Sequence, residues 1–300
     1  MNDGIRGVEV KYASAVATAG LISVFLLFSS YGYAQEVKDD HVVEQQKLPV
    51  AHEEAPPGVT GTATLGVFNK YIFRGYELSR RSVVFEPGLS ASYGGFSASF
   101  WGNIDSKEHG TQNFIPDRDG RRSFNETDLT LSYTYVVDKV SLTGGWIYYG
   151  TKYADETQEL FGTVSYDTFL KPTLSIYRDI DRYPGTYFNF SIGHSIKLPK
   201  EVALDLGASA GYLWGDGNYW KTFQPSTGAF TGPHYEAFHD GKVQAGLTIP
   251  ITKKVSFVPI VQYWFPLSSK ASRHWADASY NPNGYLGTVF VGGASINYNF

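Results

Sequence analysis

From Thr60 to the C-terminus, apolar residues alternate with Ser, Thr, Gly, Asn and acidic residues at a period of two. An extended strand with one apolar and one polar face produces this period, whereas an amphipathic helix gives a period of 3.6. We count twelve such segments, at residues 61–74, 82–93, 96–105, 124–137, 139–150, 157–167, 171–180, 185–197, 201–214, 235–249, 254–266 and 286–300. Tilted strands of this length cross a bilayer, so the sequence predicts an all-β membrane protein.

The connections between the segments alternate between short and long. Short turns are expected at Gly94-Gly95, at Asp138-Lys139, and at residues 198–200 and 252–253, and long loops at 106–123, 215–234 and 267–285. This alternation predicts a transmembrane antiparallel up-and-down β-barrel of 12 strands, with short periplasmic turns and long extracellular loops. The ring must close, because each unpaired backbone group in lipid costs several kcal/mol.

Aromatic residues on the apolar faces cluster at two heights, with aliphatic residues between them. The set expected near the outer boundary is Tyr71, Phe73, Trp146, Tyr148, Tyr212, Trp214, Tyr263 and Phe265. The set expected near the inner boundary is Tyr93, Tyr133, Tyr135, Tyr166, Tyr298 and Phe300. Two belts of this kind are typical of membrane barrels. A soluble β-sandwich, the alternative, would scatter its aromatic residues through the core.

The last fifteen residues, LGTVFVGGASINYNF, place Leu286, Phe290, Tyr298 and Phe300 on one face of a strand. This ending resembles the C-terminal signal of bacterial outer-membrane barrels, which has an aromatic at the last residue and another two before it. The resemblance implies recognition of Tyr298 and Phe300 by the barrel-assembly machinery and a location in the bacterial outer membrane. The alternative is an ordinary terminal edge strand.

The N-terminal part has a different composition. An apolar run at residues 13–28 follows Arg6 and Lys11, and a small-x-small site ends at Ala34, so we expect a signal peptide at 1–34 cleaved after Ala34. A retained membrane helix is the alternative. Residues 35–58 are acidic and contain prolines, which predicts a flexible periplasmic arm, and residues 59–300 form the outer-membrane β-barrel. The chain has no cysteine, which suits an oxidising compartment.

The opposite parity of the strands gives the expected lumen, where acidic residues outnumber basic ones. The lumen candidates are Lys70, Arg74, Glu86, Trp101, Asp105, Glu126, Asp128, Glu159, Asp179, Asp205, Glu236, Asp240 and Lys242. A barrel of twelve strands is wider than one that side chains fill, so we expect passive diffusion of small neutral or cationic solutes. In the alternative, these carboxylates are paired with the inward bases or solvated at the rims, and give no selectivity.

Two contacts across strands follow from the expected turns. A hairpin about residue 78 places Lys70 opposite Glu86, and the Gly94-Gly95 turn places Trp101 opposite Gly88. Both pairs would stiffen the wall.

Residues 69–75, NKYIFRG, followed by Ser79, resemble the Y-x-F-R-G-x-x-x-S opening of the TorF-like porin family. The resemblance is confined to this opening and to the strand plan, and Asn69-Lys70 replaces the Ser-Asp that usually precedes the tyrosine. It implies an outer-membrane channel and names no substrate. Arg74 would then point inward at the outer mouth. The acids with which we expect it to pair are Asp105, Glu126 or Asp128.

The basic residues gather in or beside the expected outer loops. They are Arg80, Arg81, Lys107, Arg118, Arg121, Arg122, Lys152, Arg182, Lys221, Lys270 and Arg273. Guanidinium and ammonium groups there suit the phosphates of lipopolysaccharide, although solvated loop charges are an equal alternative. A net charge of -4 favours no nucleic acid as a partner. A rival function is therefore a non-conducting structural or binding barrel that acts through basic extracellular loops.

Catalytic and cofactor motifs are weak. His194 with Ser191 is a possible lipase-like pair, and His109 beside the acids Asp105, Glu126 and Asp128 is a possible protease-like cluster. Asp117 and Asp119 lack a complete calcium ligand set, and the sequence has no phosphate loop, zinc spacing or nucleophile elbow. We expect no enzyme activity, cofactor or metal; a lipid-modifying enzyme or a protease is the less favoured alternative.

Overall fold

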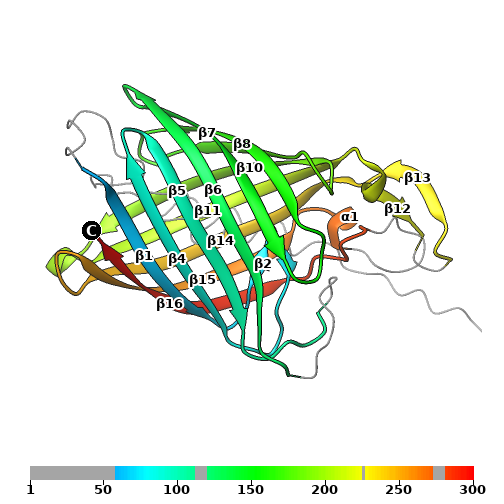
Figure 1. Ribbon diagram of the computed structural model, residues 1–300, viewed down its shortest axis with the longest axis horizontal. Helices are drawn as coiled ribbons and strands as arrows, with labels where there is room; N and C mark the ends of the chain where they lie inside the picture. Colours follow the sequence, from blue (N-terminus) through cyan, green and yellow to red (C-terminus); the bar gives the residue numbers. More distant parts are fainter. Residues whose placement is uncertain (1–57, 112–119, 225–226, 273–280) are drawn as a thin grey trace, which may run out of the picture. The chain divides into compact units, whose positions relative to one another are not determined.

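The computed structural model describes residues 58–111, 120–224, 227–272 and 281–300. Within this part, twelve strands form one closed antiparallel barrel, which confirms the predicted fold (Figure 1). They are β1 (Thr60–Phe68), β4 (Val84–Tyr93), β5 (Phe96–Asp105), β6 (Ser123–Val137), β7 (Val140–Thr151), β8 (Thr157–Tyr166), β9 (Thr173–Asp179), β10 (Gly185–Lys197), β11 (Ala203–Gly215), β14 (Glu236–Pro250), β15 (Val255–Pro266) and β16 (Val289–Asn299). The predicted signal peptide, its cleavage site at Ala34 and residues 35–57 of the predicted arm lie outside the described residues.

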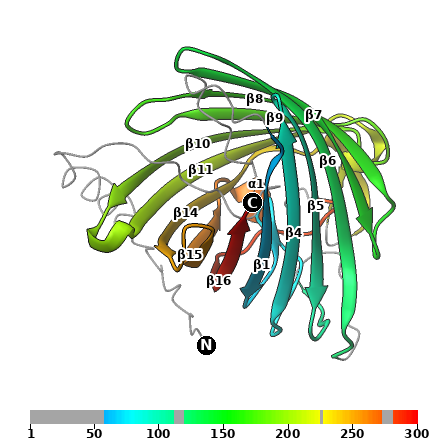
Figure 2. The ribbon, with the colours of Figure 1, turned by 60° about the vertical axis from the view of Figure 1, so that its left-hand side comes forward.

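The barrel closes between its first and last strands, which lie side by side in Figure 2. β1 pairs with β4 on one edge and with β16 on the other. At the seam, the Gly61 and Phe300 backbones exchange two N–H to C=O hydrogen bonds of 3.0 Å. Closure removes the edges of the sheet and satisfies the backbone as lipid requires.

The wall alternates as the sequence predicts, with apolar side chains outward and small polar side chains inward. On β4, for example, Leu89 is 50 % exposed and Ser90 only 5 %. Exposed aromatic residues at the strand ends, including Tyr93, Tyr133 and Tyr263, flank the aliphatic band. A closed twelve-stranded barrel with this outside is an outer-membrane barrel.

In the described part of the chain, no helix is long and apolar enough to cross a membrane. The helical elements are single turns, namely η1 (Pro199–Glu201), η2 (Asn218–Trp220) and α1 (Ser269–Ser272). Two small hairpins, β2 (Ile72–Phe73) with β3 (Tyr76–Glu77) and β12 (Lys221–Phe223) with β13 (Phe230–His234), complete the elements.

The first strand ends earlier than predicted. β1 stops at Phe68, and the following residues leave the wall and enter the lumen. The prediction that Tyr71 and Phe73 belong to the outer aromatic belt is therefore wrong: Tyr71 is 4 % exposed and packs in the interior cluster, with Phe73 against it. Leu286, predicted to face outward, is also buried, because it precedes β16 and packs in the same cluster.

β14 carries an irregularity that changes the parity of its outer end. Gly241 pairs with Ala210 but Phe238 pairs with Tyr212, so His239 and Asp240 together face the single residue Gly211. Both bulged residues point inward and are buried, whereas Phe238 is 64 % exposed. A bulge inserts one residue and reverses the alternation beyond it.

Candidate functional site

Residues 69–82 form a segment inside the barrel that we call the luminal hairpin. It connects β1 to β4 at the end of the barrel that carries the long loops, and β2 pairs with β3 within it. The Tyr71 N–H donates to Ser79 Oγ at 2.5 Å, and the Leu78 N–H donates to the Tyr71 carbonyl at 3.0 Å. The tyrosine and serine that carry the TorF-like resemblance therefore hold the base of this hairpin.

The tip of the luminal hairpin is a two-residue turn at Arg74 and Gly75, with φ of 47° and 78°. Two positive φ angles match a type I′ turn, the geometry that suits the twist of paired strands. A Cβ on Gly75 would lie 2.7 Å from Asp240 Cβ, so the wall approaches the turn too closely for another residue. Arginine rarely adopts positive φ, and the contacts of its side chain must offset this strain.

Arg74 reaches across the lumen to β8. Its Nη1 and Nη2 donate to Glu159 Oε1 and Oε2 at 2.8 and 2.7 Å, and both side chains are buried. The guanidinium also lies 4.5 Å from the ring centroid of Tyr187 and 4.8 Å from those of Phe73 and Tyr177. Bidentate pairing and stacking on rings are the interactions for which arginine is suited.

The predicted partner of Arg74 is therefore wrong. Asp105, Glu126 and Asp128 lie on β5 and β6, whereas Glu159 is on β8 and is 85 residues from Arg74 in sequence. The expectation assumed that Arg74 ends a wall strand. Once the chain turns inward, the arginine reaches the opposite wall.

The base of the hairpin contains a second ion-pair cluster. Lys70 Nζ lies 2.7 Å from Glu77 Oε1, and Arg80 Nη2 lies 3.1 Å from Glu77 Oε2. The predicted pairing of Lys70 with Glu86 is wrong, because Glu86 sits opposite Gly66.

Trp101 is opposite Gly88, as predicted, and its ring lies 5.2 Å from that of Tyr71. Trp101 thus packs against the base of the hairpin.

The other side of the hairpin packs on the bulge of β14. The Tyr76 ring lies 5.0 Å from His239, and Asn281 Nδ2 donates to the Tyr76 hydroxyl at 2.7 Å. The Tyr187 hydroxyl donates to Asp240 Oδ1 at 2.9 Å. A Cβ on Gly211 would meet both of these groups, which explains the glycine opposite the bulge. The bulge thus directs two polar side chains at the hairpin.

Most predicted lumen residues do face inward. Glu86, Asp105, Glu126, Asp128, Glu159, Asp179, Asp240 and Lys242 are buried on inward positions of the wall. Asp205 faces inward near the short turns, where it accepts hydrogen bonds from Ser195 and Thr248. The prediction that Glu236 faces the lumen is wrong. Glu236 is exposed and points outward like Phe238, because the bulge lies between it and Asp240.

A cavity of about 340 Å³ lies between the luminal hairpin and the outer loops. It is lined by Tyr71, Phe73, Arg74, Tyr76, Leu78, Asn125, Glu126, Tyr149, Thr151, Tyr153, Ala154, Asp155, Thr157, Glu159, Asp179, Tyr183, Gly185, Thr186, Tyr187, Leu213, Tyr219, Trp220 and Asn283. Aromatic rings and carboxylates dominate this lining, and Arg74 is its one basic residue. Glu126, Glu159 and Asp179 are among the predicted lumen residues, whereas Asp155 and the ring cluster are not. The pattern of single strands does not reveal this cluster, because its rings come from the hairpin, from β7 and β10, and from separate connections.

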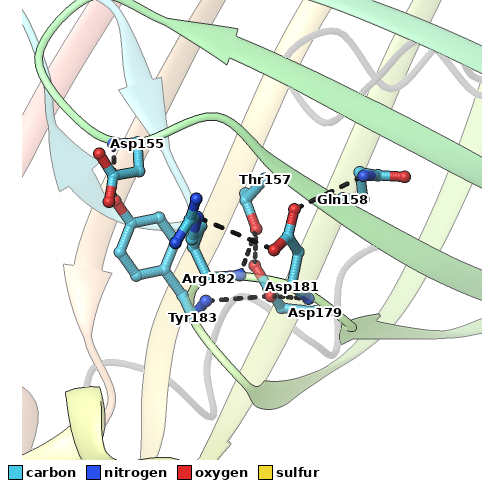
Figure 3. Close-up of polar contacts among 7 residues, drawn as sticks. All are labelled: Asp155, Thr157, Gln158, Asp179, Asp181, Arg182 and Tyr183. Carbon is cyan, nitrogen blue, oxygen red and sulfur yellow. Dashed lines mark hydrogen bonds and ion pairs between the residues drawn. The ribbon is translucent and has the colours of Figure 1, made fainter.

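Polar contacts fix the rim of this cavity between β8 and β9 (Figure 3). Asp179 accepts from the Thr157 hydroxyl at 2.7 Å and from the N–H groups of Asp181 and Tyr183 at 2.9 and 3.0 Å. The Asp155 N–H donates to the Tyr183 hydroxyl at 2.9 Å. These bonds hold Tyr183 and the Asp179 carboxylate in place.

The lumen near the short turns has a different lining, made of hydroxyl and amide side chains. They pair across neighbouring strands, as in Thr64 with Asn297 at 2.9 Å and Thr163 with Ser175 at 2.9 Å. Such pairs stabilise the wall by a few tenths to one kcal/mol each.

The candidate lipase-like pair, Ser191 with His194, is not assembled. Ser191 points inward and is buried, whereas His194 lies on the other face of β10, where its Nδ1 is 2.9 Å from the Phe169 carbonyl oxygen. No group of three His, Asp or Glu side chains among the described residues is placed to hold a metal. Asp117 and Asp119 lie outside those residues.

No protein-family model matches this chain, and no curated protein matches it. Among solved structures it is similar to the KdgM porin, with a TM-score of 0.45 and 10% identity over 80% of this chain and 99% of that one. An outer membrane channel from Pseudomonas putida F1 gives 0.47 and 10% over 84% and 99%. Outer membrane phospholipase A from Escherichia coli gives 0.41 and 15% over 79% and 92%. Similarities this distant transfer no function, so function is inferred from this chain's own residues.

Proposed function

We propose that this protein is an outer-membrane channel for passive diffusion of small neutral or cationic solutes, and that the luminal hairpin narrows its outer half. The observation that carries the proposal is a closed barrel whose polar lumen has bulky, acid-rich surroundings at one end and small hydroxyl side chains at the other. Solutes would pass beside the hairpin and then enter the wider inner half.

The charge of the constriction supports the preference for cations. Glu159 neutralises Arg74, and Glu77 pairs with both Lys70 and Arg80, so these three bases and two carboxylates together add one net positive charge. Glu86, Glu126 and Asp128 lie on neighbouring inward positions of β4 and β6. A lumen ringed by carboxylates favours cations.

Single-channel recording in planar lipid bilayers tests this function. Purified protein should give discrete current steps, and a KCl gradient should give a reversal potential of cation sign. Steps with anion preference would contradict the acidic constriction, and a barrel that inserts but gives no steps would contradict the channel.

The second candidate is a non-conducting structural or binding barrel. It is favoured by the packing of the hairpin on both sides, against β8 through Arg74 and against Asn281 and His239 through Tyr76. Its ligand would be lipopolysaccharide phosphate at the basic outer loops, where Arg121 and Arg122 are exposed. Two other basic residues of these loops already form hydrogen bonds within the protein: Lys152 donates to Ser123 Oγ, and Lys270 donates to the Glu236 carbonyl. Loss of a lipopolysaccharide-induced thermal shift in a double Arg121→Gln, Arg122→Gln variant would support this candidate.

Membership of the TorF-like porin family and recognition by the barrel-assembly machinery belong to this proposal as well. The resembling residues make up the luminal hairpin, so the family motif would encode the constriction. Tyr298 and Phe300 lie on the outer face at the seam, with ring centroids 6.2 Å apart, where they are accessible to an assembly factor. Delayed membrane assembly of a Phe300→Ala variant would support that role.

We propose no enzyme activity. Ser191 and His194 lie on opposite faces of one strand, so an acyl-transfer pair would require another serine. Hydrolysis of phospholipid by the purified barrel at a rate above that of a Ser191→Ala variant would contradict this.

A further inference from the structure

We propose that the cavity above the luminal hairpin is a binding site for a small organic cation, such as an amine or a quaternary ammonium compound. The inference deepens the proposed channel, on which its biological use rests, by naming the solute class. Binding itself can be measured without any current.

The cavity has the size and enclosure of a small-molecule site. Its volume is about 340 Å³, within the usual range for such pockets of roughly 300–1,000 Å³. The hairpin residues Phe73, Arg74 and Tyr76 form one side, and Tyr153, Tyr183 and Trp220 from outer connections form the other. A solute entering from outside therefore meets this cavity before the constriction.

Three rings make a corner on the outer wall of the cavity. The Tyr183 and Tyr219 centroids are 4.6 Å apart at 62°, and those of Tyr219 and Trp220 are 5.3 Å apart at 87°. Rings that meet edge to face present π-faces in more than one direction, and cages of this type bind quaternary ammonium groups.

Cations of the protein already use the neighbouring rings in this way. The Arg74 guanidinium lies on Tyr187, and Lys152 Nζ lies 5.3 Å from the Tyr153 centroid. Both pairs lie in the same cavity lining or at its edge, whereas the corner of Tyr183, Tyr219 and Trp220 has no such pairing among the cation–ring contacts of the described residues.

The charges of the lining favour a positive ligand. The carboxylates are Glu126, Asp155, Glu159 and Asp179, against Arg74 as the base. Glu159 already compensates Arg74, so no base of the lining balances the charge of the other three carboxylates. Of the outer bases nearby, Arg182 lies 3.8 Å from Asp181, and Lys152 donates to Ser123 Oγ.

One carboxylate of the lining, Asp179, is positioned before any ligand arrives. Three donors fix Asp179, and the same turn carries Tyr183 (Figure 3). An anion would face these oxygens directly. A neutral sugar would stack on the rings but gain nothing from the charge.

Isothermal titration calorimetry on the folded barrel in detergent micelles tests the proposal, with choline as the probe. The neutral isostere 3,3-dimethyl-1-butanol has the same shape without the charge. Choline should bind about tenfold more tightly than the isostere, since cation–π and carboxylate attraction are then the difference. Equal affinities, tighter binding of glucose, or undetectable choline binding would each overturn the assignment.

Two variants place the site. Tyr219→Leu removes the middle ring of the corner, and Asp155→Asn removes an exposed rim carboxylate; each should weaken choline binding several-fold and leave the isostere nearly unchanged. Matched controls are Tyr263→Leu in the outer belt and Asp205→Asn in the inner lumen, which should bind choline as the wild type does. Heat-modifiable gel migration verifies folding. A control that weakens binding as much as the site variants would refute the location.

The outcomes separate this inference from the channel. Choline binding by a barrel that never conducts would keep the site and reject the channel, whereas current steps with no choline binding would do the reverse.

Discussion

The outer and inner halves of the lumen belong to the same twelve strands but are built by different rules. In the outer half, contacts join residues far apart in sequence, such as Arg74 with Glu159 and Tyr76 with Asn281, 205 residues away. In the inner half, small side chains pair with the adjacent strand, as Thr134 does with Thr143. The wall alone determines the inner half, whereas an inserted segment determines the outer half. Resistance to solutes and selectivity should therefore lie in the outer half.

Removing the hairpin should have the largest effect, because it abolishes the difference between the halves. Replacing residues 71–78 with a short Gly-Ser linker should raise single-channel conductance several-fold and weaken selectivity. A matched control shortens the tip between β12 and β13, which leaves the luminal hairpin intact and should change conductance little. Unchanged conductance after removal of residues 71–78 would show that the constriction lies elsewhere.

Breaking the ion pair at the hairpin tip should come next. Arg74→Met leaves Glu159 buried without its base, an arrangement that costs roughly 3–5 kcal/mol if nothing relaxes. The hairpin can relieve this by leaving the wall, so we expect flickering, higher current and a smaller loss of unfolding free energy in urea.

Arg74→Lys is the conservative control, because lysine keeps the charge but cannot make the bidentate contact. It should give an intermediate current. A lysine variant identical to Arg74→Met would mean that geometry, not charge, holds the tip.

Neutralising wall carboxylates should change selectivity more than conductance. The double variant Glu126→Gln, Asp128→Asn removes two buried acids of the outer half and should move the reversal potential toward zero. Asp205→Asn, in the inner half, should move it less. Equal shifts would place the selective region along the whole lumen.

Changes to the hydroxyl pairs of the inner half should be smallest. Thr163→Val removes one cross-strand hydrogen bond to Ser175 and should lower the free energy of unfolding by less than about 1 kcal/mol. Conductance should not change. A loss of several kcal/mol in urea unfolding would show that these pairs act as a connected network.

The sequence predicts the wall well, because the alternation within each strand shows which of its side chains point inward and which point outward. Inward placement of Asp128 or Asp205 follows from parity alone, and both face the lumen. Glu236 fails because the bulge at His239 and Asp240 reverses parity, and a bulge leaves no clear sign in an alternating pattern. The prediction for Tyr71 and Phe73 is wrong for another reason: the apolar alternation of β1 continues through them although the chain has already left the wall.

The sequence by itself determined a closed barrel with an apolar outer surface. An apolar period of two, together with the need to hydrogen-bond every backbone group in lipid, permits few other folds. Only the tertiary structure decided that residues 69–82 turn inward. Their partners, Glu159, Asn281 and the bulged Asp240, lie on distant segments that closure brings to one place. The local alternation shows which way a side chain points, but it carries no information about which residues lie on the opposite side of the lumen.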